Sequence, residues 1–322
     1  MKGEFFAVGK PQFLKACQLG MNPAVTLLIM ARGTIVDNVT TSWSAQAVFN
    51  HSGMARRRAQ KAITELADAK LVKIVKGGTR PRYKLHKPKE DDLMIWLPNT
   101  LIDGAGKEVP PITRLRESCS VTMLQKFIEL YGEQDLETDG GIPRSIAWVE
   151  FKRTKICPVG PFTLYGFEKS QTKASSNGIF AEFAKIEDDS GNRGAWTILS
   201  PLAEMGLLQY EMYVAESPDK ESELIYPVNV DTNEAIDTLL NWLEERDAKG
   251  FTMKAEEFEY HGIALDHIKQ ASMVGLLRLT YRAKTSKTSR WWARDCHMAE
   301  VMTGLVERIC FKEEFQKCAH QG

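Results

Sequence analysis

GMARRRAQKAITELADAKLVKIVKGGTRPRYKL, residues 53–85, is the stretch that decides the fold expected for the N-terminal part of this chain. Small and apolar residues stand at positions 59, 62, 63 and 66, the i, i+3, i+4, i+7 spacing of a helix with one buried face. β-branched residues at 71–75 predict a strand, the glycines at 77 and 78 a turn, and the alternation at 82–85 a second strand. The opposite face of the helix carries four side chains that can donate hydrogen bonds to phosphates or base edges: Arg57, Gln60, Lys61 and Thr64.

Two further helices are expected before this stretch. One covers residues 22–32, with Pro23 in its first turn, where a missing backbone N–H is tolerated. The second covers 45–51, and Ser44 is placed to cap it by accepting a hydrogen bond from a free backbone N–H. Gly53 then supplies the positive φ that a tight turn between two helices needs.

This order of elements resembles the winged helix-turn-helix family over about residues 20–88, roughly a quarter of the chain. Two positions depart from the family pattern. Ala55 stands where a Ser or Thr usually caps the helix, and Lys70 stands where a glycine usually ends it. Related domains are common in bacterial regulators and in phage or plasmid replication proteins. The resemblance is carried by Gly53-Met54-Ala55-Arg56, Ala62-Ile63, Leu66 and Lys70-Leu71-Val72.

The resemblance implies that this module binds double-stranded DNA. The helix would enter a major groove, and Arg80 near the tip of the hairpin would reach an adjacent minor groove or its phosphates. Winged helices also serve as dimerisation or protein-docking modules, so a protein-binding role stays open. The side chains assigned to DNA are Arg56, Arg57, Arg58, Gln60, Lys61, Thr64, Lys73, Lys76, Arg80, Arg82 and Lys84.

Charge is segregated along the chain, although 42 basic residues balance 42 acidic ones. Residues 51–90 carry a surplus of nine positive charges, and residues 199–270 a surplus of eleven negative charges. Blocks of opposite sign favour separate modules, one of which faces a polyanion. The acidic block is better suited to a homodimer contact or to a protein partner, and solvated faces that segregate by chance are the alternative.

Two later segments echo the first module, which predicts an α+β fold of two or three tandem winged helix-turn-helix modules. The first echo is a helix ending at 202–208, followed by strands at 209–216 and 223–230 around a tip with Asp219, Glu221 and Glu223. The second echo is a helix end at 271–277, followed by a strand at 278–283, with a helix at 234–249 upstream. A helix followed by Gly-Leu-Leu and a strand is also a common junction in any α+β protein.

The echoes give four expected regions: a basic DNA-binding domain at 1–90, a linker at 91–120, a second domain at 121–231 and a third at 232–322. A helix is expected at 121–131, whereas the short strands and loops of 132–178 are left unassigned. The third region offers a possible second nucleic-acid contact beside Trp291 and Trp292, through Arg278, Arg282, Lys284, Lys287, Arg290 and Arg294. Adjacent tryptophans such as Trp291 and Trp292 more commonly pack in or at the rim of a core than contact nucleic acid.

No catalytic residues, cofactor or metal site is expected, and the protein is predicted not to be an enzyme. Residues 104–108 resemble a phosphate-binding loop only in part, because Leu101 and Glu108 replace the required Gly and Ser or Thr. The six cysteines, at 17, 119, 157, 296, 310 and 318, form no CxxC pair and fit a reducing cytoplasm. No apolar run is long enough to span a membrane, so no membrane association is expected.

The favoured function is sequence-specific DNA binding in transcriptional control, in a bacterium or on a mobile element. A phage or plasmid replication initiator with tandem winged helices is the runner-up. A third possibility is a protein-interaction module such as a phage-type inhibitor or adaptor. An operator in the protein's own promoter favours the regulator, tandem repeats at an origin favour the initiator, and failure to bind any DNA favours the interaction protein.

Overall fold

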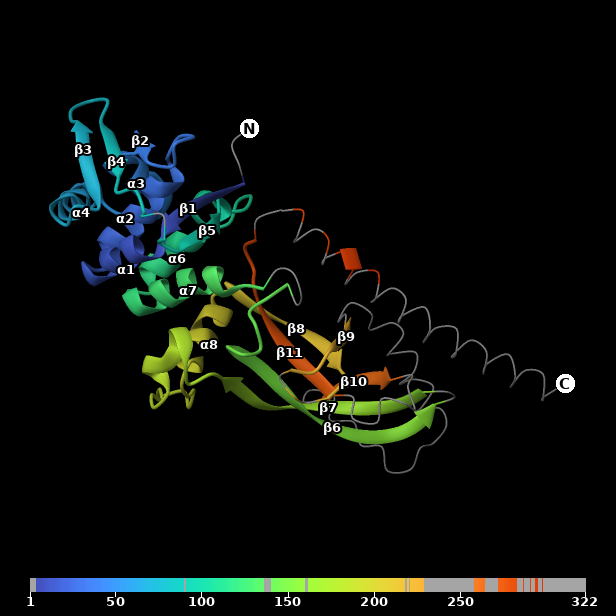
Figure 1. Cartoon of the computed structure of the whole chain (residues 1–322). Coiled ribbons are helices and arrows are strands. Elements are labelled where there is room, and N and C mark those ends of the chain that lie inside the picture. Colours follow the sequence, from blue (N-terminus) through green and yellow to red (C-terminus); the bar gives the residue numbers. More distant parts are fainter. Residues whose placement is uncertain are drawn as a thin grey trace. The chain divides into compact units, whose positions relative to one another are not determined.

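The computed structural model describes residues 4–89, 91–135, 140–159, 162–217, 219, 221–228, 258–263 and 272–282, with isolated positions at 286, 290, 293, 294 and 297 (Figure 1). The fold is mixed α and β, as the sequence predicted. One compact unit combines Met1–Gln134, Ser176–Gln209 and Leu279–Thr285, and the other combines Asp135–Ser175, Tyr210–Arg278 and Ser286–Gly322. The boundaries expected at 90, 120 and 231 do not coincide with these units, because each unit is assembled from three separated stretches of chain.

The first unit contains every helix named here and two small sheets. In one sheet β1 (Phe5–Gly9) pairs antiparallel with β5 (Met94–Pro98). The other has the order β2-β4-β3, from β2 (Thr40–Thr41), β4 (Arg82–Leu85) and β3 (Val72–Lys76). The helices are α1 (Lys10–Gln18), α2 (Met21–Arg32), α3 (Ala45–Ser52), α4 (Arg56–Asp68), α5 (Thr100–Asp103), α6 (Pro111–Glu117), α7 (Val121–Glu133), the 3-10 helix η1 (Gly178–Phe183) and α8 (Trp196–Glu204).

The elements expected between residues 22 and 85 are confirmed one by one. Helices α2, α3 and α4 and the hairpin β3–β4 fall within a few residues of the expected bounds. The Ser44 hydroxyl accepts a hydrogen bond from the Gln46 backbone N–H at 3.3 Å, as the cap prediction required. Gly53 takes a φ of 67°, and Lys70 a φ of 61°, the left-handed conformation that a glycine usually supplies.

Residues 91–120, expected to be a linker, are instead part of the first unit's core. Ile95 and Leu97 of β5 are fully buried, and so are Ile112 and Leu115 of α6. Strand β5 forms a backbone ladder with β1 and packs against helix α7, and α6 packs among the helices α2, α3, α5 and α7. The apolar surface that both elements bury lowers the free energy of the folded unit. The helix expected at 121–131 is confirmed as α7.

The second unit is built around a six-stranded sheet in the order β10-β7-β6-β11-β8-β9. Its longest feature is an antiparallel hairpin of two 13-residue strands, which occupies most of the region that sequence patterns left unassigned. The strands are β6 (Ala147–Val159), β7 (Phe162–Ala174), β8 (Leu208–Ala215), β9 (Leu224–Val228), β10 (Phe258–Ile263) and β11 (Ser272–Leu279).

The tandem arrangement of winged modules is not confirmed. Strands β8 and β9 form the hairpin expected after α8, but β8 also has β11 as its other neighbour, so the hairpin is the margin of a larger sheet. The helix end expected at 271–277 is wrong, because 272–279 is the buried strand β11. The expected helix at 234–249 lies outside the described residues. Among the residues that are described, none of the helices has the length and apolar character needed to cross a bilayer.

Candidate nucleic-acid interface

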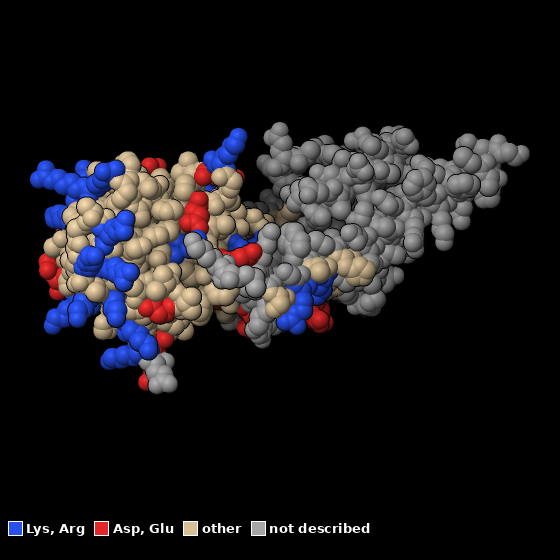
Figure 2. Space-filling view, turned by 90° about the horizontal axis from the view of Figure 1, so that it is seen from above, with Lys and Arg blue, Asp and Glu red and all other residues tan. Residues whose placement is uncertain are grey.

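Helix α4 presents two chemically different faces, as its sequence predicted. Ala59, Ala62, Ile63 and Leu66 are buried against the first unit. Arg57, Gln60, Lys61 and Thr64, which we call the outer face of α4, are all exposed, as are the neighbouring Arg56 and Arg58. In Figure 2 lysine and arginine side chains gather at the left-hand end of the described surface, where α4 and the hairpin β3–β4 lie in Figure 1.

The basic side chains of α4 differ in how far they are held by neighbours. The Arg56 guanidinium lies over the Phe49 ring, 5.7 Å from its centroid, and the Lys61 ammonium lies 3.6 Å from the Glu65 carboxylate. The Thr64 hydroxyl donates to the Gln60 carbonyl of its own helix at 3.2 Å. Arg57 has no side-chain hydrogen bond or ion pair within the described part of the chain, which makes it the outer-face cation best able to reach a ligand.

The start of α4 is left without a side-chain cap. Ala55 occupies the cap position and its methyl group accepts no hydrogen bond, as expected from the departure from the family pattern. The backbone N–H groups of the first helical turn have no partner within an α-helix, and the helix dipole adds partial positive charge there. The positive end of the helix therefore coincides with the positive charges of Arg56, Arg57 and Arg58 in the same turn.

The hairpin β3–β4 places cations directly opposite one another. In its antiparallel register Lys73 faces Lys84, and Lys76 faces Arg82, and all four are exposed. Like charges at directly opposed positions destabilise a β-hairpin by up to about 1 kcal/mol per pair. Buried Tyr83 anchors β4 on the first unit, and burial raises its pKa. Arg80 is exposed in the turn, with no side-chain partner among the described residues.

One acidic side chain lies near the hairpin, on the loop before β2. The Asp37 carboxylate accepts hydrogen bonds from the Thr40 hydroxyl at 2.6 Å, the Thr40 N–H at 2.8 Å and the Val39 N–H at 3.0 Å. These hydrogen bonds lower the pKa of Asp37, and the bond from the Thr40 hydroxyl has the largest effect. The positive charge of Lys84 lowers the pKa further. Asp37 therefore stays ionised at neutral pH, and its oxygens are committed to its own loop.

The predicted second contact does not form a single basic surface. Arg278 is 0% exposed, forms an ion pair with Glu211 and donates to the Tyr213 hydroxyl, so the prediction that it contacts nucleic acid is wrong. The reason is that β11 is an interior strand of the six-stranded sheet, where an arginine must be paired. Arg282 is half-buried, and Arg290 and Arg294 are exposed. Lys284, Lys287, Trp291 and Trp292 lie outside the described residues.

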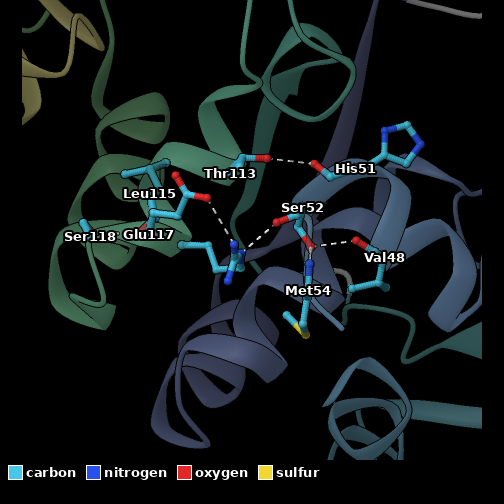
Figure 3. Close-up of polar contacts among 9 residues, drawn as sticks. Val48, His51, Ser52, Met54, Thr113, Leu115, Glu117 and Ser118 are labelled. Atoms are coloured by element: carbon cyan, nitrogen blue, oxygen red, sulfur yellow. Dashed lines mark hydrogen bonds and ion pairs between the residues drawn. The ribbon is translucent and has the colours of Figure 1, made fainter. Parts of the chain in front are cut away.

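Helix α6 contacts the C-terminal end of α3, and sequence patterns missed this contact (Figure 3). The Thr113 hydroxyl donates to the His51 carbonyl at 3.1 Å, and Arg116 Nε donates to the Ser52 carbonyl at 2.7 Å. Both carbonyls are at the C-terminal end of α3, directly before the turn that leads into α4. The only sequence signal is the i, i+3 spacing of Thr113 and Arg116, which puts them on one helix face without naming their partner.

No cluster of three or more His, Cys, Asp or Glu side chains able to hold a metal is found among the described residues. Burial, with a smaller effect of the Glu129 charge, raises the pKa of the Cys17 thiol to about 12, so this cysteine is a protonated core residue at neutral pH. Comparison of the chain with protein-family models, with curated proteins and with solved structures finds no match.

Proposed function

We propose that the protein binds double-stranded DNA in a sequence-specific manner through α4 and the hairpin β3–β4. The observation that carries this proposal is the two pairs of opposed cations in the hairpin, Lys73 with Lys84 and Lys76 with Arg82. This repulsion lowers the stability of the free protein, and a row of phosphates would relieve it. The exposed outer face of α4 lies on the next element of the same module and adds donors of the right kind for base edges.

Helix α4 and the hairpin β3–β4 would contact different parts of the duplex. We assign α4 to a major groove, with Arg57 as the main base-reading side chain, because it is exposed and held by no described neighbour. We assign the hairpin, with Arg80 in its turn, to phosphates or to an adjacent minor groove. The buried face of α4 and the buried Tyr83 of β4 fix both elements on one unit, which supports simultaneous contact.

The role that we propose for this binding is transcriptional control. The full-length chain is used to select bound sequences from a pool of random duplex DNA, and affinity for the selected site is then compared with affinity for a scrambled duplex at matched salt. A single selected site that recurs in the promoter of the protein's own gene supports regulation, whereas tandem copies at a replication origin would replace it by initiation. If no sequence is enriched and affinity does not fall as salt rises, the DNA-binding proposal fails.

A further inference from the structure

The turn between α3 and α4 is fixed by several hydrogen bonds. The Gly53 N–H donates to the Phe49 carbonyl at 2.9 Å, and the Ser52 hydroxyl donates to the Val48 carbonyl at 2.6 Å. The same hydroxyl accepts from the Met54 N–H at 3.3 Å, and the Met54 side chain is buried. Hydrogen bonds at Ser52, Gly53 and Met54 therefore fix the path of the chain from α3 towards α4.

The last carbonyls of α3 have no N–H donors within their own helix, as at any helix C-terminus. The His51 and Ser52 carbonyls accept instead from α6, from the Thr113 hydroxyl and the Arg116 Nε–H (Figure 3). The Arg116 charge also lies at the negative end of the α3 dipole, where a cation is stabilising. Arg116 is mostly buried and also pairs with Glu117 at 3.3 Å, so its guanidinium is held in place.

We propose that Thr113 and Arg116, which we name the α6 clamp, are positioning residues that fix the orientation in which α4 meets DNA. This inference rests on the proposed function and adds residues outside the helix-turn-helix module to it. Arg56, the first residue of α4, follows Ser52 by only four positions, so a loosened α3 end is transmitted directly to the start of the reading helix. Base contacts need a fixed helix orientation, whereas attraction to phosphates does not.

The consequence is a separation between specific and non-specific binding. Arg116→Ala leaves the Ser52 carbonyl without its donor, so specific binding must then order a turn that this bond no longer holds. We expect specific affinity to fall by up to roughly tenfold, because the ordering cost is at most about that of one charged hydrogen bond. Affinity for scrambled duplex and the slope of log affinity against log salt are expected to stay as in the wild type. If Arg116 instead touched a phosphate, the slope would become shallower by about 0.9.

Arg114→Ala is the matched control, because it removes the same group from the same helix. Its guanidinium donates to the Met205 carbonyl at 2.6 Å and to the Tyr281 hydroxyl, neither of which belongs to the turn. We expect Arg114→Ala to lower thermal stability while specific and non-specific affinity fall together or not at all. Arg116→Lys keeps the charge, and Thr113→Val keeps the shape, so both provide milder variants if Arg116→Ala does not fold.

Amide hydrogen exchange gives a readout that does not involve DNA. We expect the N–H groups of Gly53 and Met54 to exchange faster in Arg116→Ala than in Arg114→Ala, because only the first variant removes a bond to the turn. Unchanged exchange at both positions overturns the clamp itself. Faster exchange with equal losses of specific affinity in the two variants overturns its positioning role. If the wild-type chain binds no duplex at all, the proposed function fails first, and the link to DNA fails with it.

Discussion

Within the described residues, the same helix-to-strand junction occurs after α4 and again after α8. In the first, the Leu71 N–H donates to the Leu66 carbonyl at 2.9 Å, and Lys70 takes a φ of 61°. In the second, the Leu207 N–H donates to the Leu202 carbonyl at 2.9 Å, and Gly206 takes a φ of 67°. Both are the hydrogen-bond pattern of a Schellman helix end, followed at once by a strand of an antiparallel hairpin.

The surroundings of the two junctions differ in every respect that matters for a ligand. Helix α4 carries an exposed cationic face, whereas Trp196–Glu204 contains no lysine or arginine and buries Ile198 and Leu199. Hairpin β3–β4 belongs to a three-stranded sheet and carries opposed cations, whereas β8 lies between β11 and β9 in a sheet of six. The second hairpin has exposed acids, Glu221 among them, near its tip. The same local junction therefore leads into two surfaces of different chemistry, and side-chain charge together with strand neighbours sets the difference.

The largest expected difference between the two regions is at Arg57. We expect Arg57→Ala to lower affinity for the selected DNA site about ten- to a hundredfold, because one bidentate base contact is lost. Arg193→Ala, which removes an exposed arginine from the segment before α8, is the control and should change affinity less than twofold. Equilibrium titration of labelled duplex measures both, and equal losses in the two variants would remove the distinction between the helices.

The two junctions differ in backbone strain, because only the second has a glycine at the position of positive φ. Gly206→Ala is expected to destabilise the protein by about 1 kcal/mol, since a Cβ is disfavoured at positive φ. Lys70→Gly is expected to stabilise it by up to about 1 kcal/mol for the same reason. Urea unfolding of the two variants and the wild type tests this, and a stability change of the same sign in both would show that the junctions are not equivalent.

Substitutions in the turns of the two hairpins should differ in how they change the salt dependence of DNA affinity. Arg80→Ala is expected to make the slope of log affinity against log salt shallower by about 0.9, because one phosphate contact is lost. Asp219 is exposed in the turn between β8 and β9, and Asp219→Asn is expected to leave the slope unchanged. A slope in Arg80→Ala that equals the wild-type slope would mean that the turn of β3–β4 faces something other than DNA.

The smallest expected effect concerns the opposed cations of β3 and β4. Lys73→Thr removes the repulsion from Lys84 and should raise stability by about 0.2–1 kcal/mol, while DNA affinity falls. Adding Lys84→Thr should bring little further stability, because the same repulsion is already gone. Thermal unfolding of both single variants and the double variant checks this, and fully additive gains would show that the two lysines do not interact.

The sequence by itself determined the elements whose signals are local. The Ser44 cap, the positive φ at Gly53, the buried and exposed faces of α4 and the bounds of β3–β4 all depend on residues a few positions apart. The cationic residues of the candidate interface were found the same way, because a period of 3.6 residues separates the inner from the outer face of a helix. Local hydrogen bonds and rotamer preferences depend only on neighbouring residues. They can therefore be predicted from the sequence without knowing any distant contact.

Tertiary structure alone decided what those elements contact. Arg278 has the same charge as Arg80, but its strand is interior and the side chain is paired, whereas Arg80 lies in an exposed turn. Residues 91–120 contain three prolines and resemble a linker, yet β5 pairs with β1 some 90 residues away in sequence. Likewise, Arg116 donates to a carbonyl 64 residues earlier. Pairing of strands and capping by remote side chains depend on which surfaces meet in the folded chain, and no periodicity in the sequence encodes that choice.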